Sequence, residues 1–365
     1  MQYGKTLAST SARDDPGCHT ADAEVAVNFQ PSGYRFLVRS GETVLEAAQR
    51  LGYKMTHACA NGVCRICEAT MLEGSLRAGF NPYLAQRSQG NHKQEQHGKN
   101  RSVLLCKAQP GSECNFEFNR IRGPNELETK KYGLQIVSVE PLSETIVAVN
   151  LLAPAGSMPE YFAGQYLQLL VPGQPAAYYS IANAPGSRHI QLHIDVHPEN
   201  TNAIEVLGYL QCNAVVNAML PFGKCFLATV PDSEILLISA GTGFSQSKSI
   251  AEFLRSQRFA GAVTLYWAER NEQEMYALQL VENWCKENAK WQFVPVYADD
   301  PDNEWTGHHD RLVKAVLAGE HRWEKALAYV SGSPAMVYTA MDALLPVGLA
   351  SANYFSDVLE YAPRG

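Results

Sequence analysis

The sequence predicts a multidomain α+β and α/β chain, with a mixed N-terminal domain, an antiparallel β-barrel and a doubly wound parallel sheet. Its 365 residues exceed what one ordinary hydrophobic core holds. From Tyr132, short strands separated by Pro and Gly are typical of a small antiparallel barrel. From Glu234, strands alternate with helices, and this alternation indicates a doubly wound parallel sheet.

Composition and charge narrow the class of protein. Hydrophobic residues make up 46% and charged residues 18% of the chain, as in soluble globular proteins. The net charge of −7 and the lack of a basic stripe argue against a nucleic-acid partner. No apolar run is long enough for a membrane span, and no hydrophobic segment follows the first lysine as in a secretory signal. We therefore expect a cytoplasmic protein.

The N-terminal part divides into a polar tail, residues 1–23, and a domain over residues 24–120. Alternating residues in EVAVNFQPSGYRFLV predict a hairpin with its turn at Pro31 to Gly33. The segment GETVLEAAQRLGY predicts a helix, because its apolar residues recur at helical spacing and Gly52 follows them. Residues 121–131, rich in Pro, Gly and charge, are expected to form a linker.

Four cysteines directly after this helix carry the strongest chemical signal. Cys59, Cys64 and Cys67 are separated by four and then two residues, and Cys106 follows in SVLLCKAQP. This is the plant-type spacing for a [2Fe-2S] cluster, whose two irons need four thiolates. Zinc prefers repeated CxxC pairs, which are absent here, and ordinary buried thiols are the other alternative. The remaining five cysteines show no pairing pattern, which favours a reducing compartment.

The stretch SGETVLEAAQRLGYKMTHACANGVCRICEA, followed by LLCKAQP, resembles the ferredoxin domain fused to reductase components of bacterial oxygenases and of CDP-6-deoxy-glucoseen reductase. The resemblance implies a β-grasp [2Fe-2S] domain. One departure is Arg65, which stands where the family has Gly or His. Its cation would raise the cluster's reduction potential or serve a docking surface, or it is simply a solvated side chain. The polar segment NPYLAQRSQGNHKQEQHGKN is expected to be a surface loop, with metal binding by His92 and His97 as the alternative.

Two further domains follow, over residues 132–231 and 232–365. The barrel strands are predicted in LQIVSVEPL, TIVAVNLLA, GQYLQLLV, YYSIANA, IQLHIDV and VVNAML. In the last domain, strands are predicted in EILLISA, AVTLYWA, WQFVPVY, ALAYVS and NYFSDVLEY, and helices in SKSIAEFLRSQ, MYALQLVENWCKE, DRLVKAVLAG and AMVYTAMDALL. Gly241, Thr242 and Gly243 form the first strand-to-helix turn, where such sheets bind a pyrophosphate.

The motifs AGQYLQLLVPG, YYSIANAPG, LPFGK, SAGTGF, TLYWAER, WTGHHDRL and YVSGSPAMV resemble, in order, the flavin and nicotinamide modules of ferredoxin-NADP reductase-like enzymes. The resemblance implies that Tyr179 lies against the flavin ring and that the Ser180 hydroxyl lies near its N5. It also implies that residues 241–243 and Gly332 line the nicotinamide nucleotide. Ser331 stands where many relatives have a cysteine beside the nicotinamide, so Ser180 and Ser331 are the expected catalytic residues.

Several residues depart from the family pattern. Ala177 stands in place of the arginine of RxYS, and Ala240 in place of the first glycine of GGTG. Leu359 occupies the place of a C-terminal aromatic residue that stacks on the flavin, and Tyr361 is the nearby substitute. Purely structural roles are also open: Tyr179 and Ser180 as barrel residues, and Thr242 as a helix N-cap.

These observations predict an electron-transfer reductase. Electrons would pass from NAD(P)H through FAD to the [2Fe-2S] cluster and on to an acceptor protein such as an oxygenase or dehydrase component. NADH is favoured over NADPH, because Glu269 ends the second strand, where an acid binds the ribose 2′-OH, although Arg270 beside it suits a 2′-phosphate. Two alternatives remain: an electron carrier whose reductase-like half binds flavin weakly or not at all, and a flavin reductase that releases reduced flavin.

Overall fold

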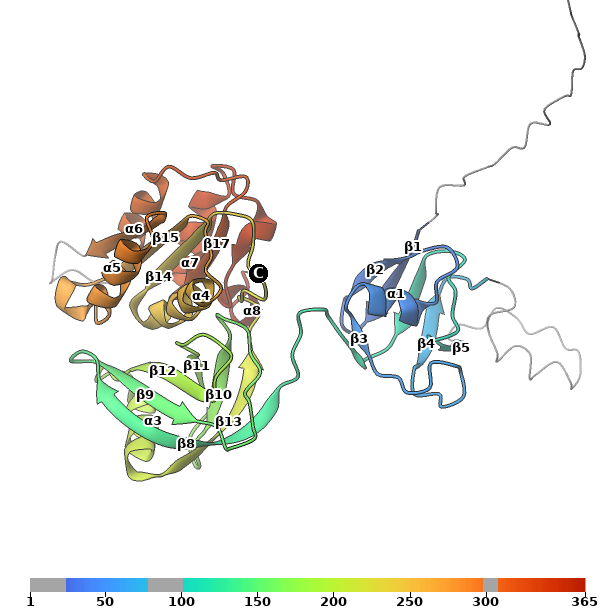
Figure 1. The fold of residues 1–365 in the computed structure, drawn as a ribbon, viewed down its shortest axis with the longest axis horizontal. Coiled ribbons are helices and arrows are strands. Elements are labelled where there is room, and N and C mark those ends of the chain that lie inside the picture. The colour runs from blue at the N-terminus through green and yellow to red at the C-terminus, as the bar shows by residue number, and fades with distance from the viewer. Residues whose placement is uncertain (1–23, 78–100, 298–307, 365) are drawn as a thin grey trace, which may run out of the picture. The chain divides into compact units, whose positions relative to one another are not determined.

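The computed structural model describes residues 24–77, 101–297 and 308–364. The chain divides into two compact units, with the boundary between Glu126 and Leu127 (Figure 1). That boundary lies inside the predicted linker. Residues 121 and 122, however, form strand β7 (Ile121–Arg122), which pairs with β3 (Lys54–Met55) of the first unit. The predicted tail 1–23 and the predicted loop with His92 and His97 lie outside the described residues.

Over the residues described, the first unit consists of a five-stranded mixed sheet, in the strand order β2-β1-β6-β4-β5, and one helix. Its elements are β1 (Val25–Gln30), β2 (Arg35–Val38), α1 (Val44–Arg50), β4 (Glu68–Glu73), β5 (Arg101–Leu104) and β6 (Cys114–Glu117). Strands β1 and β2 form the predicted hairpin, and β1 pairs in parallel with β6. Apolar side chains of α1 and of the strands share one core, as a β-grasp domain requires.

Helix α1 is fixed at its start by a reciprocal cap. The Thr43 hydroxyl accepts from the Glu46 N–H at 3.2 Å, and the Glu46 carboxylate accepts from the Thr43 N–H at 2.8 Å. Such a capping box contributes about 1 kcal/mol. The first N–H groups of the helix then donate to the backbone carbonyls of Leu105 and Ala108. Helix α1 therefore holds the segment that carries Cys106.

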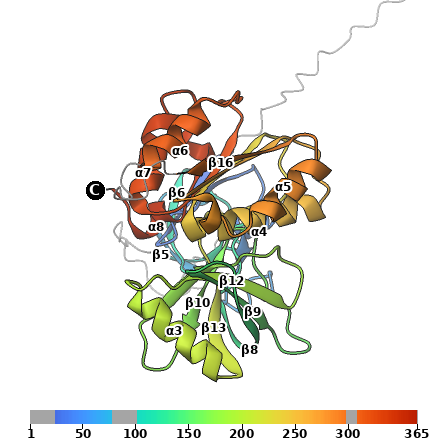
Figure 2. The ribbon, with the colours of Figure 1, turned by 90° about the vertical axis from the view of Figure 1, so that its left-hand side faces the viewer.

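The second unit begins with a six-stranded antiparallel sheet in the order β11-β10-β13-β8-β9-β12. The strands are β8 (Lys130–Pro141), β9 (Ile146–Leu152), β10 (Tyr166–Leu170), β11 (Ala177–Ser180), β12 (His189–Asp195) and β13 (Val215–Phe222). A bridge between Ile181 and Leu192 joins the two edge strands and nearly closes the barrel. Helix α3 (Thr201–Cys212), which the sequence did not predict, packs Ala203, Val206 and Leu210 into the barrel core (Figure 2).

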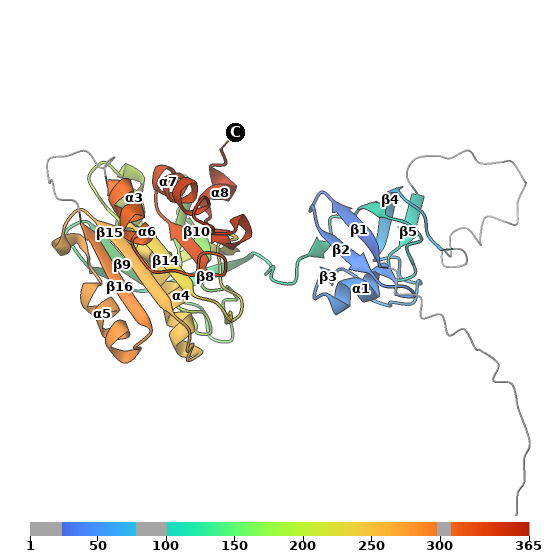
Figure 3. The ribbon, with the colours of Figure 1, turned by 90° about the horizontal axis from the view of Figure 1, so that it is seen from above.

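The rest of the unit is a parallel five-stranded sheet in the order β16-β15-β14-β17-β18. Its strands are β14 (Ile235–Ala240), β15 (Val263–Glu269), β16 (Trp291–Tyr297), β17 (Leu327–Ser331) and β18 (Tyr354–Phe355). Helices α4 (Phe244–Ser256) and α5 (Leu278–Glu287) cover one face, and α6 (His308–Leu317) and α7 (Pro334–Leu344) cover the other (Figure 3). The predicted doubly wound architecture is confirmed.

The predicted last strand is wrong for most of its length. Only Tyr354 and Phe355 pair in the sheet, and α8 (Val358–Tyr361) follows as a short helix. The side chain of Asp357, at the start of α8, accepts hydrogen bonds from the backbone N–H groups of Lys224 and Cys225. This contact turns the chain away from the sheet edge before a longer strand can form.

Polar residues of α4 join the barrel to the parallel sheet. Lys248 Nζ donates to the carbonyl of Ala182 at 3.0 Å, and Ser249 Oγ donates to that of Asn183 at 2.8 Å. Lys248 also pairs with Glu252 at 2.6 Å, so its buried charge is compensated. Buried polar groups whose hydrogen bonds are satisfied favour a single arrangement, here that of the barrel against the parallel sheet. Across the described residues, no helix is long and apolar enough to cross a membrane.

Candidate active site and cluster loop

The four predicted cluster cysteines lie close enough for their thiols to interact. Cys67 and Cys106 are 2% and 4% exposed, whereas Cys59 and Cys64 are half-buried. Left-handed backbone at Ala60, Gly62 and Arg65 curls the loop between the first three cysteines. The N–H of Leu105 donates to the Cys67 carbonyl at 3.1 Å, which ties the Cys106 segment to the loop.

The thiols lie in two pairs, Cys59 with Cys64 and Cys67 with Cys106, and the Cys64 N–H donates to the Cys59 sulfur at 3.2 Å. Backbone N–H groups of Cys64 and Asn61 point at the Cys59 sulfur and lower its pKa to about 6. Burial, followed by the contact with Cys67, raises the pKa of Cys106 to about 12. The N–H donors around Cys59 stabilise its thiolate, whereas burial of Cys106 favours the neutral thiol until a cation compensates its charge.

The donor set fits a two-iron cluster. Its four donors are all cysteine thiols, from the loop at residues 59–67 and from Cys106. A [2Fe-2S] cluster takes its four thiolates as two for each iron, and the two thiol pairs offer that division. The residues present therefore fit the cluster predicted from the spacing.

Arg65 is neither simply solvated nor an uncompensated cation. Its Nε and Nη2 donate to the two carboxylate oxygens of Glu68, both at 2.9 Å. The guanidinium lowers the pKa of Glu68, so the carboxylate stays ionised. Arg65 and Glu68 thus form a bidentate ion pair, which adds no net charge beside the cluster loop.

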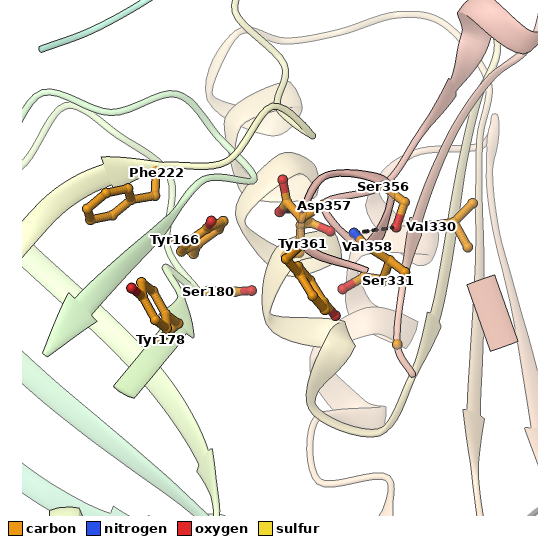
Figure 4. A pocket seen from close by; sticks show the side chains of 12 residues that line it. Tyr166, Tyr178, Ser180, Phe222, Val330, Ser331, Ser356, Asp357, Val358 and Tyr361 are labelled. Atoms are coloured by element: carbon orange, nitrogen blue, oxygen red, sulfur yellow. Dashed lines mark hydrogen bonds between the residues drawn. The ribbon is translucent and has the colours of Figure 1, made fainter. Parts of the chain in front are cut away.

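In the second unit, a cavity of about 620 Å³ opens between the barrel and the C-terminal segment. Three aromatic rings of the barrel form one wall, with Tyr166 stacked on Phe222 and Tyr178 edge-on to both. Tyr361 faces them from α8, and the Ser180 side chain points toward it (Figure 4). Further lining residues, Gln246, Val330, Ser331, Gly332, Ser356, Asp357 and Val358, come from the parallel-sheet half.

Strand alternation separates the two adjacent tyrosines of β11. Tyr178 is 55% exposed and lies opposite Gln168, whereas Tyr179 lies opposite Leu167 and packs against the barrel core. Both tyrosines line a second cavity, but only Tyr178 also lines the first. The predicted ring contact of Tyr179 with flavin stays a prediction. Tyr178 is the tyrosine that sequence reasoning missed.

The second cavity, of about 370 Å³, adjoins the first, because Ser180, Ser331, Gly332 and Tyr361 line both. It also contains residues 241–243 at the start of α4. A Cβ on Gly241 would meet nothing within 4 Å, whereas one on Gly243 would lie 2.3 Å from the Ser331 carbonyl oxygen. No side chain caps α4, so Thr242 is not its N-cap.

The start of α4 also places a hydroxyl at the second cavity. Ser245 lines this cavity, is 2% exposed and lies beside the Tyr276 side chain. Helix N-termini favour anionic groups. The open turn and this hydroxyl therefore fit the pyrophosphate of a pyridine nucleotide.

Three acidic residues, Glu269, Glu274 and Asp195, also line this cavity together with Arg270, and the other three charges act on Glu269. Glu269 is 6% exposed, and burial, followed by the charge of Glu274, raises its pKa to about 8. His193 lines the same cavity, and burial lowers its pKa to about 3, so the imidazole is neutral.

Asp357 is the charged group of the first cavity. Burial raises the pKa of its carboxyl to about 6, while hydrogen bonds from Cys225 and Gln246 oppose this shift. The Gln246 amide donates to it at 2.8 Å and also to the Gly164 carbonyl at 2.7 Å. No local pattern in the sequence predicts a role for Asp357, because its hydrogen-bond partners lie more than a hundred residues away.

Comparison with known proteins gives these sites a context. Residues 27–111 match the 2Fe-2S iron-sulfur cluster binding domain, and residues 237–342 match the oxidoreductase NAD-binding domain. The chain is 27% identical over 332 residues to the CDP-6-deoxy-L-threo-D-glycero-4-hexulose-3-dehydrase reductase of Yersinia pestis, covering 91% of this chain and 97% of that protein. It is 24% identical over 340 residues to the terephthalate 1,2-dioxygenase reductase component 2 of a Comamonas species, with coverage of 93% and 98%.

Among solved structures, the Amycolatopsis cytochrome P450 reductase GcoB shares the fold at a TM-score of 0.57 and 24% identity. The match covers 91% of this chain and 98% of that one. The order of domains, the paired thiols and the two adjoining cavities agree with these matches. The chain is therefore a [2Fe-2S] ferredoxin reductase-like protein, with a cluster-binding domain, a flavin-type barrel and an NAD-binding domain.

Proposed function

We propose that this protein carries electrons from NADH through FAD to a [2Fe-2S] cluster, and from there to an acceptor protein. The observation that supports this most is the presence in one chain of four paired thiols and two adjoining cavities between a barrel and a nucleotide-type sheet. Bound flavin supplies the step from a two-electron hydride donor to a one-electron cluster. One cavity alone would not suffice for this transfer, because the flavin and the nicotinamide must lie in contact.

The side chains at the junction of the cavities have distinct proposed roles. Ser180 and Ser331 place hydroxyl groups where flavin and nicotinamide would meet, because both residues line both cavities. Gly332 leaves room beside them, and Tyr361 provides a ring that excludes water from that junction. Residues 241–243 and Ser245 would hold the nucleotide phosphates.

NADH is the proposed coenzyme. A 2′-phosphate would have to enter a region lined by Glu269, Glu274 and Asp195. Arg270 is exposed and has interactions of its own, and the carboxylates of Glu274 and Asp195 oppose its charge. The ribose diol of NADH instead supplies hydroxyl donors that carboxylates accept. Comparison of kcat/KM for the two coenzymes checks this, and a preference for NADPH would contradict it.

The proposed acceptor is an oxygenase or dehydrase component. Relatives that match nearly their whole length are named as reductases of a dioxygenase and of a sugar dehydrase. A one-electron cluster at an exposed loop suits transfer to a protein partner, and Val63, between Cys59 and Cys64, is 78% exposed. Capture of a partner from the native cell, followed by NADH-driven reduction of that purified partner, would identify it.

Reconstitution tests the proposed route. Protein loaded with iron, sulfide and FAD should reduce cytochrome c or ferricyanide with NADH. The Cys64→Ser variant should keep flavin reduction by NADH but lose transfer beyond the flavin. Stopped-flow absorbance separates the two steps, and cytochrome c reduction at the native rate in this variant would rule out the route through the cluster.

A further inference from the structure

The first cavity, of about 620 Å³, is lined by a distinctive set of side chains. Its walls carry four aromatic rings, several hydroxyl and amide groups, and one charged side chain, that of Asp357. None of the described residues lining it is a lysine or arginine. A phosphate placed there would meet a carboxylate and no cation, so the cavity is unsuited to the charged part of FAD or FMN.

No residue of strand β11 carries a positive charge, and position 177 is an alanine. Ala177 is 4% exposed and packs in the barrel core opposite Leu169. A bidentate arginine contact with phosphate is therefore impossible at this position. Of the residues of β11, Tyr178 and Ser180 line the first cavity, and neither can form an ion pair with a phosphate.

The aromatic residues are placed to bind a flat ring system. Tyr178 is 55% exposed and Tyr361 is 62% exposed, from opposite sides of the cavity (Figure 4). Large aromatic side chains gain most from burial when a planar ligand covers them. A volume of about 620 Å³ lies in the range of cavities that hold a drug-sized ligand.

We infer that this protein recognises flavin by its ring system and not by its phosphates. Riboflavin, FMN and FAD then bind with comparable affinity, and the flavin exchanges with the solution instead of staying as a permanent prosthetic group. This inference rests on the proposed function, because it takes the first cavity as the flavin site. It specifies the ligand class of that site: any isoalloxazine with an unblocked ring.

Titration of the flavin-free, full-length protein with the three flavins tests the inference. Quenching of flavin fluorescence reports stacking directly and does not depend on turnover. The three dissociation constants should agree within about threefold, and that of FMN should change less than about twofold between low and high salt, because no phosphate ion pair is screened. FAD or FMN binding more than tenfold tighter than riboflavin would overturn the inference while leaving the electron route intact.

Variants of Tyr178 test whether its ring is the surface that binds the flavin ring system. The Tyr178→Ala variant should weaken all three flavins by a similar factor of about ten or more, because the ring stacks on what the flavins share. Tyr178→Phe keeps the ring and should bind as the native protein does. Tyr178 is on the outer face of β11, so circular dichroism should show both variants folded. Loss of FAD binding alone in Tyr178→Ala would contradict recognition through the ring, and failure of all three flavins to bind the native protein would refute the flavin site itself.

Discussion

At the scale of single residues, charge and burial decide what the sites accept. The Arg65 and Glu68 side chains form a bidentate pair beside the cluster loop, so neither charge acts alone on the cluster. Adding an electron to a cluster is favoured by a nearby cation and opposed by a nearby anion. The departure at position 65 is thus offset three residues later in the same chain.

Breaking this pair should shift the cluster's reduction potential in opposite directions. The Glu68→Gln variant leaves the guanidinium uncompensated and should raise the potential by tens of millivolts, roughly the effect of one partly screened charge. The Arg65→Gln variant should lower it, and the double variant should return close to the native value. Redox titration followed by EPR measures all three. Equal potentials in both single variants would show that the pair does not act on the cluster.

Glu269 provides a second residue-scale prediction, for the protein without nucleotide. Its pKa is raised to about 8, so between pH 4.5 and 8 the native state holds a proton that the unfolded state has released. Stability from this group therefore falls as pH rises through that window. The Glu269→Gln variant should match the native protein near pH 5 and exceed its free energy of unfolding by roughly 3–4 kcal/mol near pH 8. Urea denaturation at the two pH values checks this, and a constant difference would contradict it.

At the scale of elements, the contact between the C-terminal segment and the barrel positions the first cavity. Asp357 accepts from two backbone N–H groups and from Gln246, so α8, the β13–β14 connection and α4 meet at one carboxylate. Gly223 must be glycine there, because its φ is +92° and a Cβ would lie 2.7 Å from Asp357 Oδ1. Tyr361 is placed four residues after this anchor.

Removing the anchor should be costly. The Asp357→Ala variant leaves buried donors unpaired and should lose about 2–4 kcal/mol of unfolding free energy in urea. Asp342 offers a matched control, because its pair with Arg364 is on the surface, with 60% of its side chain exposed. The Asp342→Ala variant should lose less than about 1 kcal/mol. Similar losses in the two variants would mean that Asp357 is not an anchor.

The close packing of the turn before α4 leads to a prediction about NADH binding, with another glycine of the chain as control. Gly243→Ala would place a Cβ against the Ser331 carbonyl, so it should push β17 away from the turn and weaken NADH binding at least tenfold. Gly208 in α3 is exposed, with nothing within 4 Å of its Cβ position. Gly208→Ala should stabilise the protein by about 0.5–1 kcal/mol and leave coenzyme affinity unchanged. Unchanged NADH affinity in Gly243→Ala would show that the close approach does not shape the site.

The sequence predicted those elements whose signals are local. The spacing of the cysteines, the hairpin at Gly33 and the alternation after Glu234 each depend on neighbouring residues. Helix α3 was missed, because only Ala203, Val206 and Leu210 of its twelve residues are buried and Gly208 interrupts its helical pattern. The roles of Tyr178 and Asp357 were missed for another reason. Strand facing and long-range hydrogen bonds depend on tertiary packing, which no local pattern records.

At the scale of the whole molecule, the two compact units have different roles in the proposed electron transfer. The first presents paired thiols for a one-electron centre, and the second brings a flavin-type cavity and a nucleotide-type cavity into contact. Within the second unit, the buried polar contacts of α4 fix the barrel against the sheet. The central claim is that electrons given to the second unit by NADH arrive on iron in the first.

Anaerobic reduction by NADH, followed by EPR spectroscopy, measures that arrival directly. With protein isolated under anaerobic conditions and supplied with flavin, substoichiometric NADH should produce the paramagnetic signal of a reduced [2Fe-2S] cluster. The signal should approach one unpaired electron per chain as NADH is added, and the Cys64→Ser variant should lack it. Iron and acid-labile sulfide in the native protein without any such signal, or the absence of both, would contradict the account.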